Sequence, residues 1–172
     1  VMLTIQGIDT LRIFGAESRV IYGIGISMPQ EFAPLITGII VAGRSGSALT
    51  SRVGSMQLNG EVDALTVMGI APARFIVAPP LIALFISLPV LVACANLVGL
   101  AAAGFYIDLL LGIGPEAYWP EIIETVSVDD YLFGLTKACV FAVLIALISI
   151  STGMRVAGGA EVLGRATTSS VV

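Results

Sequence analysis

Residues 43–69 read GRSGSALTSRVGSMQLNGEVDALTVMG and separate two apolar runs that are each long enough to cross a membrane. This segment carries the charged residues Arg44, Arg52, Glu61 and Asp63, whereas the runs on either side carry almost no charge. Charged side chains are costly in hydrocarbon. We therefore predict that the polar segment lies outside the bilayer, where it can contact a soluble partner.

The composition of the whole chain predicts a membrane protein. The 172 residues are 57% hydrophobic and 12% charged, with a mean hydropathy of +1.02, whereas soluble domains carry about 25% charged residues. So much apolar surface cannot be hidden in a soluble fold of this length. We predict an all-α, polytopic bundle of membrane helices.

The residue inventory argues against catalysis and metal binding. The chain has no histidine, which removes the commonest general base and metal ligand. No nucleophile–base set and no metal cluster is evident, so we expect no catalytic residue, no metal and no cofactor in this chain. Cys94 and Cys139 lie inside apolar runs and are expected to be small buried hydrophobic residues. The net charge of −4 comes mainly from one acidic loop, and nothing suggests a nucleic-acid partner.

Apolar and polar runs alternate along one domain, residues 1–172. We read the chain as a fragment that lacks the first and last membrane helices, because it starts within an apolar run and stops on small residues. The expected segments are the end of a membrane helix (1–7), an outer interfacial segment (8–19), a span (20–43), a cytoplasmic loop with a short helix (44–74), a span (75–107), an outer acidic loop (108–130), a span (131–152) and a cytoplasmic segment leading to a further helix (153–172).

Basic residues give the expected orientation. Arg44, Arg52 and Arg74 flank one loop, and Arg155 and Arg165 lie in the final segment. The loop 108–130 has six acidic residues and no Lys or Arg. We therefore place the two arginine-bearing segments in the cytoplasm and the acidic loop outside.

Residues 57–67 are predicted to form a short amphipathic helix. Leu58, Val62 and Leu65 recur at helical spacing, and Asp63 lies toward the polar side. Such a helix can pack on the membrane surface or insert into the groove of a partner. An ordinary connecting loop is the alternative that the pattern leaves open.

The same segment resembles the signature of the MlaE/YrbE permease family, the membrane subunits of Mce-associated lipid ABC transporters. Two further stretches, 3–18 and 158–172, resemble that family in the expected order. The chain departs from the family at Gln30 and Pro80, where relatives commonly carry Arg, while Glu31 and Pro34 are kept. The matching motif residues are Gly43, Arg44, Gly46, Glu61, Asp63, Ala64, Gly69, Gly159, Glu161, Gly164 and Arg165.

The resemblance implies a homodimeric permease of the bacterial inner membrane. Each copy would bind a cytoplasmic ATPase subunit, the dimer would be capped by Mce-domain proteins, and the cargo would be phospholipid or a similar lipid. ATP and Mg²⁺ would belong to the ATPase, and this chain has no P-loop pattern of its own. The implied ATPase-coupling residues are Leu58, Glu61, Val62, Asp63, Ala64 and Leu65. A secondary transporter and a membrane scaffold without transport remain the alternatives.

Five further residues have a functional interpretation. Glu31 lies inside a span, where an acid usually faces a cavity or a partner; we favour a structural ion pair, although no basic partner is evident. Asn96 is expected to hydrogen-bond between helices. Tyr118 and Trp119 are expected to anchor the outer loop at the membrane interface, and Lys137 to reach the interface with its long side chain.

Small residues recur at four-residue spacing in the two later spans, as they do where membrane helices approach closely. Their abundance in apolar helices is an equally good explanation. The two stripes are Ala95, Gly99 and Ala103, and Ala138, Ala142 and Ala146.

Overall fold

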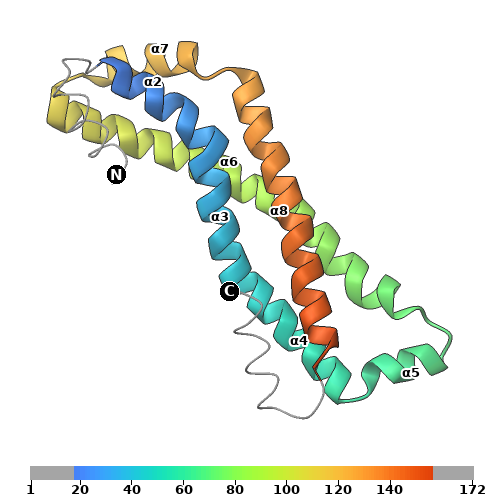
Figure 1. Cartoon of the computed structure of the whole chain (residues 1–172). Coiled ribbons are helices and arrows are strands. Elements are labelled where there is room, and N and C mark those ends of the chain that lie inside the picture. Colours follow the sequence, from blue (N-terminus) through green and yellow to red (C-terminus); the bar gives the residue numbers. More distant parts are fainter. Residues whose placement is uncertain (1–17, 157–172) are drawn as a thin grey trace. The chain divides into compact units, whose positions relative to one another are not determined.

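The computed structural model describes residues 18–156, and within this range every regular element is a helix. The predictions made for residues 1–17 and for the motif at 158–165 lie outside the described residues. Figure 1 shows the helices in chain order. They are α2 (Ser18–Ser27), η1 (Met28–Phe32), α3 (Ala33–Val41), η2 (Ala42–Gly46), α4 (Ser47–Leu58), α5 (Glu61–Val67), η3 (Ala73–Val77), α6 (Ala78–Leu111), α7 (Pro115–Thr125) and α8 (Val128–Met154).

Three of the described helices are long and apolar enough to cross a membrane, which confirms the predicted all-α, polytopic class. They cover Ile21–Leu58, Ala73–Leu110 and Val128–Met154. Each contains one of the predicted spans 20–43, 75–107 and 131–152. The first helix is much longer than its predicted span, because its backbone does not break at the polar residues after Ala42.

The segment 44–74, predicted as a loop around one short helix, is helical over most of its length. Helix continues through η2 and α4 as far as Leu58. Two hydroxyls bond backward to carbonyls one turn earlier: Ser47 Oγ donates to the Gly43 carbonyl at 2.6 Å, and Thr50 Oγ1 donates to the Gly46 carbonyl at 3.1 Å. Such bonds satisfy polar side chains within a helix. The location of this segment outside the bilayer stays a prediction.

Wide π-helical turns stand just before prolines in the two longest helices. The turn η1 precedes Pro34, and η3 precedes Pro79 and Pro80. Proline lacks an N–H, so the carbonyl four residues earlier loses its usual hydrogen-bond donor. A π-helical turn, with its wider hydrogen-bond spacing, is one way in which the backbone accommodates this loss. At the start of the second span, the π-helical turn η3 therefore leads directly into α6.

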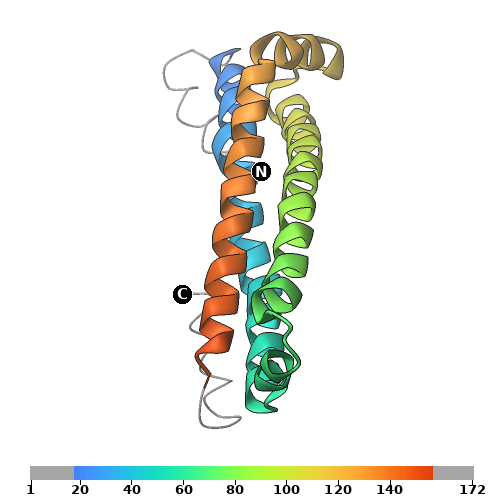
Figure 2. The ribbon, with the colours of Figure 1, turned by 90° about the vertical axis from the view of Figure 1, so that its right-hand side faces the viewer.

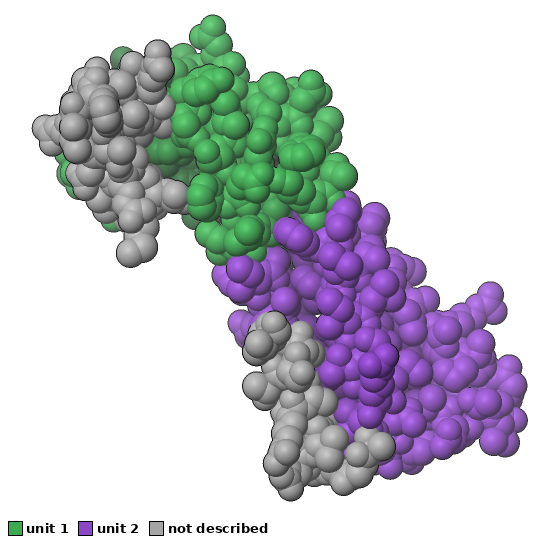
Figure 3. All heavy atoms as spheres, in the orientation of Figure 1, with its two compact units in different colours: residues 1–36, 91–137 green, residues 37–90, 138–172 purple. Residues whose placement is uncertain are grey.

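The described chain forms two compact units, coloured separately in Figure 3. Unit 1 contains residues up to Ile36 together with Leu91–Lys137. Its core consists of Ile21 from α2, Ile107 from α6, and Tyr118 and Ile122 from α7. In both ribbon views α7 lies beside α2 (Figures 1 and 2). The predicted outer loop 108–130 is thus largely a packed helix, because Tyr118 and Ile122, one turn apart, supply an apolar face.

Unit 2 contains Thr37–Val90 and the residues from Ala138 onward. Its core combines Val53 of α4, Val62 of α5, Ile76 of η3 and Ile150 of α8. A hydrogen bond of 3.0 Å from Thr50 Oγ1 to the Ser149 carbonyl joins α4 to α8. This bond satisfies a buried hydroxyl and ties the two helices together.

The small-residue stripe on α8 is a packing surface. Ala138, Ala142 and Ala146 are fully buried. On α6, Ala103 is also buried, and a side chain added at Gly99 would collide with Met28 of η1. Small residues at these positions allow the helices of each unit to approach closely, as in other membrane bundles.

Gly134 of α8 provides a direct test of this close packing. A Cβ at Gly134 would overlap the Pro29 carbonyl, which is backbone and cannot move alone. We expect Gly134→Ala to destabilise the protein by about 1–3 kcal/mol. The measurement is thermal unfolding in detergent.

Gly23→Ala is the matched control. Gly23 lies in α2 of the same unit and has no atom within 4 Å of an added Cβ. Alanine there favours helix by about 0.4–1 kcal/mol, so the melting temperature should stay or rise. Equal effects of the two substitutions would contradict the packing described for η1 and α8.

Candidate functional site

Helix α5 is set off from its neighbours by two glycines in the left-handed conformation. Gly60 has a φ of 73° and precedes Glu61, the first residue of α5. Gly69 has a φ of 74° in the turn after α5. Glycine adopts this conformation without the steric cost that other residues meet. The predicted single helix over 57–67 is therefore wrong: Leu58 ends α4, and α5 begins only after the turn at Gly60.

One face of α5 holds the helix against its own chain. Val62 is buried in the core of unit 2, and Leu65 packs against that core. Leu58 belongs to α4 and is partly exposed, so the predicted common face of Leu58, Val62 and Leu65 does not exist. Val62 and Leu65 anchor α5 and are not a free surface for another protein.

The opposite side of α5 is exposed and acidic. Glu61, Asp63 and Ala64 are all exposed, and the only hydrogen bond from these side chains to described residues is a long one of 3.3 Å between Asn59 Nδ2 and Glu61 Oε1. The helix is therefore held by two apolar residues while its carboxylates point away from the core. A surface of this kind can bind a basic partner.

An apolar surface that sequence analysis missed follows the acidic residues. Val67 is 88% exposed, and Met68 and Ile70 are also exposed. They lie at the end of α5 and in the turn around Gly69. Gly69 is the sequence signal that could have located them, because a glycine just after an apolar run often marks the end of a helix. We call Glu61, Asp63, Val67, Met68 and Ile70 the α5 surface.

The motif before α4 has a mainly structural role in this fold. Gly46 is buried, and a Cβ there would lie 3.0 Å from Ser149 Oγ of α8. The Gly43 carbonyl accepts the Ser47 hydroxyl, as described above. Arg44 is exposed. Gly46 therefore allows η2 to pack closely on α8, and the exposed side chain of Arg44 is available to contact something else.

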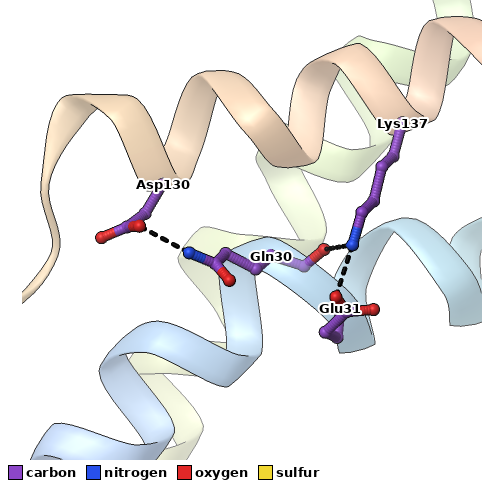
Figure 4. A network of polar contacts seen from close by, with 4 residues as sticks. All are labelled: Gln30, Glu31, Asp130 and Lys137. Atoms are coloured by element: carbon purple, nitrogen blue, oxygen red, sulfur yellow. Dashed lines mark hydrogen bonds and ion pairs between the residues drawn. The ribbon is translucent and has the colours of Figure 1, made fainter.

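Glu31 has an ion-pair partner that the sequence did not reveal. Lys137 Nζ of α8 lies 2.5 Å from Glu31 Oε1 of η1 (Figure 4). The two residues are 106 positions apart in the chain. Lys137 was predicted to extend to the membrane interface, but its ammonium instead neutralises Glu31. Both residues lie within helices long enough to span a membrane.

The proline at position 34 helps to explain why the lysine is needed. Pro34 has no N–H, so the Gln30 carbonyl lacks the donor that an α-helix would supply. Lys137 Nζ donates to this carbonyl at 3.1 Å. Gln30 Nε2 in turn donates to Asp130 Oδ1 at 2.5 Å, which completes the network in Figure 4. The Lys137 ammonium also lies 4.6 Å from the centre of the Phe133 ring, a favourable cation–π distance.

Two further sequence predictions need correction. Tyr118 does not anchor an interface: its ring is buried, and its hydroxyl donates to the Leu100 carbonyl at 2.8 Å. Burial raises the pKa of Tyr118 to about 12. Asn96 is buried, but its Oδ1 has no hydrogen-bond partner among the described residues, so the predicted interhelical bond through this oxygen is absent. Trp119 is exposed, as expected for an anchor.

Comparisons with known proteins identify the family. A family model described as Permease MlaE matches residues 1–172. The chain belongs to the MlaE permease family. This permease is 32% identical to a probable ABC transporter permease protein of Rickettsia typhi over 172 residues. It is also 32% identical to a probable ABC transporter permease protein of Synechocystis over 171 residues.

The permease covers only part of these relatives. The alignments take in 99% of this chain and 66% of the Rickettsia protein, and 99% of this chain and 65% of the Synechocystis protein. A third relative is the Arabidopsis thaliana chloroplast protein Trigalactosyldiacylglycerol 1, with 32% identity over 169 residues, 98% of this chain and 48% of that protein. The relatives are named as probable ABC transporter permeases, and the three long apolar helices of this chain agree with a multi-pass membrane location.

The ion pair predicts a characteristic pattern of mutant stabilities. Lys137→Met leaves the Glu31 carboxylate without a counter-charge, and we expect a loss of about 1–3 kcal/mol, between the values for exposed and buried pairs. Adding Glu31→Gln removes the uncompensated charge and should restore part of the loss. Thermal unfolding of the wild type, both single variants and the double variant in lipid nanodiscs measures this coupling. Additive losses would show that the two side chains do not interact.

Proposed function

We propose that this permease is the membrane subunit of an ABC transporter that moves phospholipid or a similar lipid, using ATP hydrolysed by a separate subunit. The α5 surface would be the docking site for that ATPase. The observation that carries the proposal is the geometry of α5, which is anchored by Val62 and Leu65 while Glu61 and Asp63 point outward. The helix joins two membrane-crossing helices through glycine turns, so a movement of the docked partner is passed to both.

Charge and apolar contact would act together in this docking. Two carboxylates can pair with basic side chains of the ATPase, and they fix the orientation of the encounter. The neighbouring Val67, Met68 and Ile70 supply apolar area that would be buried on binding. The coupling residues are thus Glu61, Asp63 and the three exposed apolar residues, with Ala64 small enough to permit close approach.

Two observations support a lipid as cargo. The chain belongs to the MlaE family, and one relative is named after trigalactosyldiacylglycerol, a glycolipid.

The exposure of Glu31 bears on what surrounds η1. The Glu31 side chain is 58% exposed within a membrane-spanning helix despite its pairing with Lys137. An acid exposed to acyl chains is costly, so we infer that this side of η1 faces a polar route or another subunit.

The proposed assembly rests on the resemblance to the MlaE/YrbE family. We propose a homodimer in the bacterial inner membrane, with ATP and Mg²⁺ bound by the ATPase subunits and an Mce-domain protein on the opposite side of the membrane. A secondary transporter would need no ATPase and would use ionisable relays or broken helices at a central site. A scaffold would bind partners without moving lipid. Co-purification of an ATPase together with lipid transfer by the reconstituted complex separates the three.

Charge reversal on α5 tests the proposed docking. Glu61→Lys combined with Asp63→Lys replaces attraction by repulsion, and losing two charge-assisted contacts of about 1.5–3 kcal/mol each weakens ATPase binding by at least about tenfold. The permease alone should keep its melting temperature, because both side chains are exposed. The measurement is ATPase co-purification at low salt, followed by lipid transfer between vesicles.

The matched control reverses two exposed acids elsewhere. Glu116→Lys combined with Glu124→Lys on α7 makes the same change of net charge, and ATPase binding should be unaffected. Undiminished binding and transfer in the α5 variant would refute the docking site. Loss of binding in the control alone would place the docking site elsewhere on the chain.

A further inference from the structure

Short connections keep helix α7 close to the ends of two helices that are long and apolar enough to cross a membrane. Only residues 112–114 separate it from α6, and only residues 126–127 separate it from α8. Extended chain reaches about 3.5 Å per residue, so α7 starts within about 14 Å of the end of α6 and ends within about 10 Å of the start of α8. Helix α7 is therefore tied to the side of the membrane at which α6 ends and α8 begins.

Three different stripes run along α7. Tyr118 and Ile122 are buried in the core of unit 1. Glu116 and Glu124 are exposed and lie on the opposite side of the helix, according to its 100° turn per residue. Between these two stripes a third remains exposed although it is apolar. It consists of Trp119, 43% exposed, and Ile123, 75% exposed, one turn apart.

Exposed apolar residues also lie immediately before and after α7. Leu109 and Leu110 stand near the end of α6, and Val128 begins α8. These residues belong to helices long and apolar enough to cross a membrane. The apolar stripe of α7 therefore continues the lipid-facing surface of its neighbours along the chain, which favours lipid over a protein as its occupant.

We propose that α7 is an interfacial helix that inserts Trp119 and Ile123 into the boundary between headgroups and acyl chains. Trp prefers this depth because its ring is apolar and its N–H is polar. Glu116 and Glu124 then face the aqueous side, as polar faces of interfacial helices do. Since Tyr118 and Ile122 pack against Ile21, the inserted helix also holds the end of α2 at the membrane surface.

The charge of the segment defines which lipids fit. Residues 108–130 contain six acidic residues and no basic one. Most interfacial helices use Lys and Arg to bind anionic lipids, and α7 has the opposite charge. We therefore expect zwitterionic headgroups around α7, because anionic headgroups are repelled by its carboxylates.

Tryptophan fluorescence tests the insertion, since Trp119 is the only tryptophan in this chain. The complex is reconstituted with lipids brominated either near the headgroup or near the end of the acyl chain, and the signal of a Trp119→Phe complex is subtracted. We expect blue-shifted emission, stronger quenching by the shallow bromines and little quenching by aqueous iodide. Ile123→Asn should reduce bromolipid quenching by about half, because the stripe loses much of its apolar area.

Ala117→Asn is the matched control, since Ala117 is exposed on the other flank of α7; quenching should be unchanged. Red-shifted emission with strong iodide quenching would overturn the proposal by placing Trp119 in water. Protection from both bromolipid and iodide would overturn it by showing that a protein covers the stripe.

The lipid preference has its own test. Replacing half of the zwitterionic lipid by phosphatidylglycerol should lower bromolipid quenching at low salt, and high salt should restore the quenching. Equal quenching in zwitterionic and anionic membranes would overturn this preference.

Discussion

Hydrocarbon offers no hydrogen bonds, so each polar group within a membrane helix must find its partner inside the protein. Lys137 meets this requirement for two groups at once. Its ammonium pairs with the Glu31 carboxylate and donates to the Gln30 carbonyl, whose helical donor is missing because residue 34 is proline. The turn η1, Pro34 and Lys137 therefore belong together, because the proline removes a backbone donor and the lysine replaces it.

The same constraint shapes unit 2. Thr50 Oγ1 bonds both to the Gly46 carbonyl of its own helix and to the Ser149 carbonyl of α8. This contact requires the two backbones to be close, and Gly46 and Gly153 make that possible: a Cβ at Gly153 would lie 2.8 Å from the Thr50 carbonyl oxygen. Glycine at these two positions therefore allows the hydrogen bond between Thr50 and Ser149, which holds α4 against α8. Helix α5 is in turn held against α4, because Val62 and Val53 are buried in the same core.

The helical class and the approximate position of the spans could be predicted from composition and apolar runs, because these depend on local sequence. The partner of Glu31 could not be predicted, since Lys137 lies 106 positions away and only the packing of η1 on α8 brings the two together. The inward direction of Tyr118 was missed for a similar reason: its ring fits against α6 at Gly104, a contact that no local pattern encodes. The face of α5 was misjudged because Gly60 restarts the helix, so spacing counted from Leu58 no longer applies.

Helix α5 has an outward surface of Glu61, Asp63, Val67, Met68 and Ile70, which we propose binds the ATPase, while Val62 holds the helix from within. Site-specific photo-crosslinking tests this docking, with a benzoylphenylalanine placed singly at Val67, Asp63 or Glu116 in the assembled transporter. Glu116 is exposed on α7 and serves as the negative position, because a bulky side chain fits there without disturbing a packed core. We expect crosslinks to the ATPase from Val67 and Asp63 and none from Glu116. An ATPase that assembles fully yet crosslinks from neither position on α5 would contradict the proposed docking.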